Sequence, residues 1–114
     1  MDEIEVYFLY DSEYIEFETS QKGFRLDVYV HINGEFFNIN IYNLIRLKQD
    51  FNEAIQDEGY YSIDPNLVLV QDVNKKEILF TIKKLYEQKY FESLKPVENI
   101  NTSDLIKITL YEEK

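Results

Sequence analysis

The chain of 114 residues contains no cysteine and no tryptophan, and it has only three glycines and two prolines. Without cysteine it can form neither a disulfide framework nor a thiolate zinc site. Its glycines, Gly23, Gly34 and Gly59, are scattered, so they assemble neither a phosphate-binding loop nor a dinucleotide fingerprint. We therefore expect no cofactor and no nucleotide site.

Long hydrophobic runs are also missing. No apolar run approaches the roughly 20 residues that a membrane-spanning helix needs, and the negative charge repels anionic lipid headgroups. The start Met-Asp-Glu-Ile-Glu lacks the basic and apolar regions of a secretory signal. The sequence therefore predicts a cytoplasmic protein without membrane association.

Basic side chains are scarce: 12 Lys and Arg stand against 22 Asp and Glu, which gives a formal net charge of -10. The stretches Met1 to Gln21 and Gln49 to Asp64 contain no basic residue. Because such a charge repels phosphate backbones, direct nucleic-acid binding is disfavoured. Two interpretations stay open: the charge keeps a monomer or weak homodimer soluble, or it forms a surface that docks on a basic protein.

Apolar residues make up 45% of the chain and aromatic residues 16%, enough for one core. We expect a single domain over residues 1–114. Alternating apolar positions predict strands over Ile4 to Tyr10, over Tyr14 to Thr19 and over Ile106 to Leu110, the last at or near a sheet edge. The run Leu67 to Val70 is apolar throughout, which predicts a strand buried on both faces inside the sheet.

The clearest local signal is Asn33-Gly34 between Phe24–Ile32 and Glu35–Tyr42, because Asn-Gly readily forms a type I′ hairpin turn. A two-residue loop fixes the cross-strand register. The predicted pairs are Ile32 with Glu35, Val30 with Phe37, Val28 with Ile39 and Leu26 with Ile41 on one side, and His31 with Phe36, Tyr29 with Asn38, Asp27 with Asn40 and Arg25 with Tyr42 on the other.

Two segments have helical periodicity. The first begins after Asn43 and ends at Gly59, a usual C-terminal stop. The second begins at Asn74, which with Glu77 resembles a capping box, and runs to about Lys89. The order predicts an α+β domain: a largely antiparallel sheet of five to six strands with two helices packed on one face.

Catalytic and metal sites find little support in the sequence. His31, the single histidine, has no flanking nucleophile motif and no predicted orienting carboxylate. The N-terminal carboxylates lack the spacing of a calcium loop, and a glycosidase pair would need a sugar cleft that short chains rarely build. We expect a non-enzymatic protein without a bound metal.

Two sets of carboxylates and tyrosines are candidate protein-binding surfaces, because tyrosine is enriched in interface hot spots and carboxylates fix Lys or Arg of a basic partner. The first set faces outward on the predicted strands and comprises Glu3, Glu5, Tyr7, Tyr14, Glu16, Glu18, Asp27 and Tyr29. The alternative set lies on the first helix and its exit and comprises Asp50, Glu53, Asp57, Glu58, Tyr60 and Tyr61. A solvated sheet face is the competing interpretation of the first set.

The order of elements resembles the small acidic immunity proteins that bacteria pair with polymorphic or contact-dependent toxins, in particular the group catalogued as immunity protein eight. The residues behind the resemblance are the hairpin Val28-Tyr29-Val30-His31-Ile32-Asn33-Gly34 with Phe37-Asn38-Ile39, the run Leu67-Val68-Leu69-Val70, and the helix from Lys75 that ends in Tyr90-Phe91. The resemblance implies a non-enzymatic inhibitor that occludes a basic toxin such as a nuclease. An adaptor or self-associating domain is the alternative, and a small hydrolase is the third hypothesis.

Overall fold

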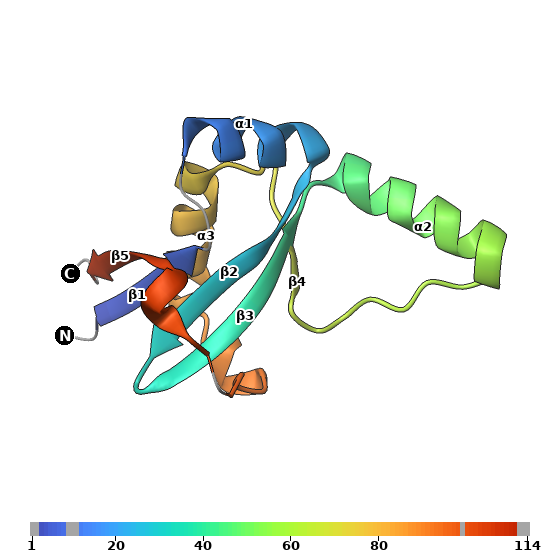
Figure 1. Cartoon of the computed structure of the whole chain (residues 1–114). Coiled ribbons are helices and arrows are strands. Elements are labelled where there is room, and N and C mark those ends of the chain that lie inside the picture. The colour runs from blue at the N-terminus through green and yellow to red at the C-terminus, as the bar shows by residue number, and fades with distance from the viewer. Residues whose placement is uncertain (1–2, 9–11, 99, 112–114) are drawn as a thin grey trace.

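The computed structural model describes residues 3–8, 12–98 and 100–111 of the chain, and within them it has an α+β fold (Figure 1). The predicted fold class is confirmed, with three helices in place of two. In chain order the elements are β1 (Glu3–Phe8), α1 (Glu13–Lys22), β2 (Phe24–Ile32), β3 (Glu35–Tyr42), α2 (Leu44–Glu58), β4 (Leu67–Leu69), α3 (Lys75–Glu87), the 3-10 turns η1 (Tyr90–Ser93) and η2 (Thr102–Asp104), and β5 (Ile106–Tyr111). The predicted strand residues Leu9 and Tyr10 lie outside the described residues.

The sheet has the strand order β4-β3-β2-β1-β5. All pairs are antiparallel except β3 with β4, which is parallel. The prediction that β5 lies at an edge is confirmed, whereas the prediction that Leu67 to Val70 lies inside the sheet is wrong. Because β4 pairs on one side only, Leu69 remains 47% exposed. A continuous apolar run cannot by itself distinguish an interior strand from a short edge strand.

The core lies between one face of the sheet and α3, which Figure 1 shows behind the strands. Alternate residues of β1, β2 and β3 point into it, as the period of two requires. Ile78 and Ile82 of α3 and Phe91 of η1 close it from the other side. Each fully buried aliphatic side chain contributes about 1.5–3 kcal/mol, so this face supplies most of the stability.

The hairpin register is confirmed near the turn and wrong farther from it. Val28 pairs with Ile39 and His31 with Phe36, as predicted, but Arg25 pairs with Ile41 because a β-bulge adds one residue to β2 between Arg25 and Val28. The predicted pairs Leu26 with Ile41, Asp27 with Asn40 and Arg25 with Tyr42 are therefore not formed. The Asn38 side chain donates to the carbonyls of Leu26 and Val28, both at 3.1 Å, and so satisfies backbone groups at the bulge.

The segment Tyr14 to Thr19, predicted as a strand, is the middle of helix α1. Ser12 caps its N-terminus by accepting from the Ile15 amide at 3.2 Å, and Gly23 ends it in the left-handed conformation, with φ of 78°. Caps of this kind satisfy backbone groups that the first and last turns leave unpaired. The alternation of apolar and polar residues over these six positions misled the prediction. No residue of α1 is buried, so periodicity carries little information in this segment.

Helix α2 projects from one end of the sheet, and the following segment returns alone to β4 (Figure 1). Asn43 caps its start by accepting from the Arg46 amide at 2.8 Å, and Gly59 ends it with φ of 85°. No residue of α2 is buried, and the structure describes all of them. The helix is therefore an arm attached through its first two turns, whereas the sequence predicted a helix packed on the sheet.

The base of this arm is a junction between the two helix caps at Gly23 and Asn43. The Asn43 amide donates to the Gly23 carbonyl at 2.8 Å, so the end of α1 and the start of α2 are joined directly. A Cβ at Gly23 would lie 2.6 Å from Oδ1 of Asn43 and 3.0 Å from Cβ of Arg46. Glycine is required here by both its positive φ and this close approach.

We expect Gly23→Ala to lower the free energy of unfolding by about 2–4 kcal/mol, because the substitution combines an unfavourable backbone conformation with a steric clash. Gly34→Ala is the matched control: its φ is 82°, but a Cβ there meets nothing within 4 Å. Urea denaturation of both variants would measure the two losses. Equal losses would show that the contact with Asn43 contributes nothing.

Candidate protein-binding site

Helix α2 carries an exposed apolar stripe. Leu44, Phe51 and Ile55 follow one another at spacings of seven and four residues, which places them on one face. Their exposed fractions are 53%, 48% and 41%. We call these three residues the apolar ridge. The prediction of an amphipathic helix is confirmed, but its apolar face does not pack against the sheet as expected.

The segment that follows Gly59 partly covers one flank of α2. Tyr61 packs edge-on against Phe51, with ring centroids 6.4 Å apart. Burial, followed by the charges of Asp50 and Asp64, raises the pKa of Tyr61 above its ordinary value. Burial and then the charge of Asp50 raise the pKa of Tyr42 in the same way. Asp50 thus lies in a partly desolvated position between two phenols.

A hollow of about 440 Å³ lies at the far end of the arm, between α2 and the returning segment. All six residues of the alternative predicted set line it, and we call it the distal acidic hollow. Its lining residues are Asp50, Glu53, Ala54, Asp57, Glu58, Tyr60, Tyr61 and Ser62. Arg46 forms an ion pair with Asp50 at 3.1 Å. The other three carboxylates, of Glu53, Asp57 and Glu58, lie in the stretch from Gln49 to Asp64, which contains no basic residue.

The first predicted set is not brought together. Glu5, Tyr7 and Tyr29 lie on the sheet face opposite α3, where Tyr7 pairs with Tyr29. Tyr14 and Glu18 are instead on α1, since that segment is a helix and not a strand. Hydrogen bonding to Lys22, then to Tyr14, lowers the pKa of Glu18. Glu3 is the first residue of β1, and the structure does not describe its side chain.

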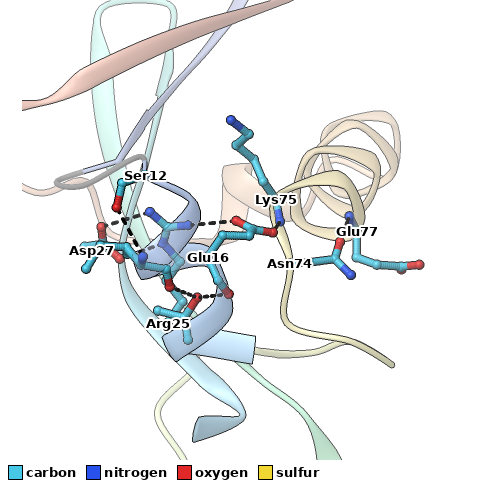
Figure 2. Close-up of polar contacts among 9 residues, drawn as sticks. Ser12, Glu16, Arg25, Asp27, Asn74, Lys75 and Glu77 are labelled. Atoms are coloured by element: carbon cyan, nitrogen blue, oxygen red, sulfur yellow. Dashed lines mark hydrogen bonds and ion pairs between the residues drawn. The ribbon is translucent and has the colours of Figure 1, made fainter. Parts of the chain in front are cut away.

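The other two members of that set, Glu16 and Asp27, take part in an internal network around Arg25 (Figure 2). The bulge in β2 turns Arg25 to the core side, and its side chain is 1% exposed. Arg25 Nε lies 3.0 Å from Oδ1 of Asp27, and Nη1 lies 3.7 Å from Oε2 of Glu16. The guanidinium also stacks over the Phe8 ring at 4.4 Å, a favourable cation–π geometry.

Glu16 also caps helix α3. Its Oε1 accepts a hydrogen bond from the Lys75 amide at 2.6 Å, next to Asn74, which accepts from the Glu77 amide at 2.8 Å. Figure 2 shows Glu16 between Arg25 and the first turn of α3. A carboxylate at this position is favoured by the helix dipole. Glu16 therefore joins α1, β2 and α3, a structural role that alternation in the sequence did not indicate.

The open sheet face carries a second polar cluster. His31 Nδ1 lies 2.8 Å from Oε1 of Glu5, whose Oε2 lies 3.1 Å from Lys107 Nζ. The Phe36 ring stacks on the His31 ring with centroids 4.4 Å apart, which agrees with the predicted cross-strand pair of these two residues. The expectation that His31 lacks an orienting carboxylate is wrong, because the pairing of β1 with β2 brings Glu5 opposite His31. Only that long-range register, which no local sequence signal fixes, places them together.

Another hollow, of about 580 Å³, lies between the hairpin turn and η1. Its lining is mixed: it includes Ile32, Tyr86 and Leu94 together with the charged residues Glu35, Glu87 and Lys89. Among residues 3–8, 12–98 and 100–111 no group of three His, Asp or Glu side chains could hold a metal ion. No helix in the same ranges has the length and apolar character needed to cross a bilayer.

Comparisons with known proteins add no relative: no protein-family model, no curated protein and no solved structure matches the chain.

The Glu16 network predicts a difference between two carboxylates of α1. We expect Glu16→Ala to lower the free energy of unfolding by about 1–2 kcal/mol, because it leaves the Lys75 amide and part of the buried Arg25 charge without their acceptor. Glu18→Ala removes an exposed ion pair with Lys22 and a hydrogen bond with Tyr14, and it should have a much smaller effect. Chemical denaturation of the two variants compares them directly, and equal values would contradict the structural role of Glu16.

The cluster on the sheet face predicts an acid dependence. Hydrogen bonding to His31, then to Lys107, holds the pKa of the Glu5 carboxyl below its ordinary value of 4.5. Because the folded-state pKa is lowered, this group stabilises the fold above about pH 4.5, and its contribution disappears as the pH falls through the lowered value. We expect Glu5→Gln to lose less stability than wild type over that pH range, measured by urea denaturation. Identical pH profiles would contradict this.

Proposed function

We propose that the protein is a non-enzymatic binding module that uses the distal acidic hollow to bind a basic protein, as an immunity-type inhibitor of a toxin would. The observation that carries the proposal is the position of the hollow. Its carboxylates and tyrosines converge at the free end of an arm that projects from the sheet. An inhibitor of this kind acts by occlusion and needs no catalytic group of its own.

Charge and shape both favour this use of the arm. Glu53, Asp57 and Glu58 occupy the last six residues of α2, and the segment from Gln49 to Asp64 adds no positive charge. Such a concentration of negative charge raises the association rate with a positively charged partner. Tyr60, 62% exposed beside these carboxylates, offers an amphipathic anchor of the type common in hot spots. A basic cleft that binds phosphate is the complementary surface.

The self-associating alternative has one specific observation in its favour, the apolar ridge. That ridge lies on a different side of α2 from Glu53 and Asp57, so the two modes of binding do not compete for the same residues.

The proposal predicts that neutralising the hollow slows binding. We would capture partners of the tagged chain from an extract of the cells that produce it, at low and moderate salt, and identify them by mass spectrometry. For a captured basic protein, Glu53→Gln/Asp57→Asn/Glu58→Gln should lower the association rate by about tenfold at low salt, because electrostatic steering is lost. Biolayer interferometry measures the rate and its salt dependence.

The matched control is Glu35→Gln/Glu92→Gln/Glu98→Gln, which changes the net charge equally at exposed positions away from α2. It should change the rate by less than about threefold, since steering depends on charge near the interface. Co-expression then tests whether the wild-type chain suppresses the toxicity of the captured protein. Equal effects of the two triple variants, or binding without suppression, would contradict an inhibitor that uses the hollow.

A further inference from the structure

We propose that the hollow between the hairpin turn and η1 binds a small organic cation, in which an ammonium group is attached to an apolar body. We call this site the hairpin hollow. The turn Asn33-Gly34 closes one end of β2 and β3, and α2 begins at their other end, next to Gly23 (Figure 1). The inference therefore goes beyond the proposed function and concerns a different part of the molecule.

The apolar part of the lining belongs to the hydrophobic core. Ile32, Phe37 and Phe91 line the hollow and are each no more than 7% exposed, so the hollow reaches the end of the core. The Phe37 and Phe91 rings are tilted against each other, with centroids 5.5 Å apart. Tyr86 and Leu94, both partly buried, add to this lining. A ligand with an aromatic or aliphatic body would bury apolar surface here.

The walls of the hollow are held by structure that does not depend on a ligand. On one side is the tight turn of the hairpin, in which Asn33 and Gly34 have φ of 51° and 82°, as a type I′ turn requires. On the other side is η1, where the Leu94 amide donates to the Phe91 carbonyl at 3.2 Å. The volume of about 580 Å³ lies within the range of about 300–1,000 Å³ that small-molecule pockets usually have.

The charged part of the lining favours a cation. It consists of three carboxylates, those of Glu35, Glu87 and Glu92, and the ammonium group of Lys89. Lys84, which does not line the hollow, pairs with Glu87 at 3.7 Å, and this still leaves two carboxylates against Lys89. An anion would meet this excess of negative charge in addition to the net charge of -10 on the whole chain.

A neutral apolar ligand is also disfavoured, because it would displace water from the carboxylates and give them no partner in return. An ammonium group replaces that water with a charge-assisted hydrogen bond. A cation beside an aromatic ring gains a further attraction to the ring face. The combination of aromatic rings with carboxylates therefore favours a ligand that is both cationic and apolar.

Three probes with the same phenylbutyl body test the class of ligand. They are phenylbutylamine, phenylbutanol and phenylbutanoate, which at about pH 7 are a cation, a neutral molecule and an anion. Each is titrated into the whole isotope-labelled chain, and the amide chemical shifts are followed. The amine should cause saturable shifts around Ile32, Tyr86 and Leu94, with a dissociation constant on the order of millimolar. It should bind at least about fivefold more tightly than the alcohol, and the carboxylate should bind most weakly.

Two variants of the lining test whether its charges carry this selectivity. Glu35→Gln/Glu92→Gln removes two exposed carboxylates and should weaken binding of the amine by at least about threefold. Lys89→Gln removes the opposing ammonium group and should strengthen binding of the amine by about twofold. The matched control is Glu53→Gln/Asp57→Asn in the distal acidic hollow, which changes the net charge as much as the first variant and should leave the dissociation constant unchanged. Circular dichroism confirms that each variant folds.

The opposite outcomes overturn the proposal. Equal affinities for the amine and the alcohol would show that the apolar lining alone binds the probes. Amide shifts concentrated on α2, or equal weakening by the two double variants, would show that the amine responds to the negative charge of the chain and not to this hollow. Tightest binding of the carboxylate, weakened by Lys89→Gln, would assign the hollow to anions. An amine that causes no saturable shift would remove the hollow as a ligand site.

Discussion

The packing of three elements depends on the contacts of one buried group, the guanidinium of Arg25. It lies under α1 and over Phe8, with carboxylates from α1 and β2 beside it. A charge removed from water requires such partners, because its desolvation costs several kcal/mol. One of these partners, Glu16, also satisfies the first turn of α3. The network thereby fixes how α1 and α3 meet, and it gives two of the chain's many carboxylates, both partly exposed, a structural role.

Local signals predicted much of this fold. Asn33-Gly34, Asn43 with Gly59, and Asn74 with Glu77 each act within a few residues, and the structure has the turn and both helices where they indicate. The errors concern long-range relations. The bulge that turns Arg25 inward, the edge position of β4 and the approach of Glu5 to His31 depend on partners distant in sequence. The prediction missed helix α1 because it relied on a short alternation of apolar and polar residues. The caps at Ser12 and Gly23 favour a helix there instead.

The same distinction applies to the candidate site. The alternative set was contiguous in sequence on one helix and its exit, and it forms one hollow. The first set was collected by assuming one sheet face, and it divides among a sheet, a helix and an internal network. Sequence could not show that the apolar side of α2 remains exposed, because periodicity predicts a buried face without identifying what buries it.

The attachment of α2 through its first two turns alone has a consequence for local stability. Its backbone hydrogen bonds are held by few buried contacts, so the helix can open at a lower free energy than the sheet, whose strands exclude water on the α3 side. Helices of this length are marginal when isolated in water. Any molecule that covers the arm therefore also shifts this local equilibrium toward the helix, and part of its binding free energy is spent on ordering. Affinity at the arm and helicity of the arm are thus thermodynamically linked.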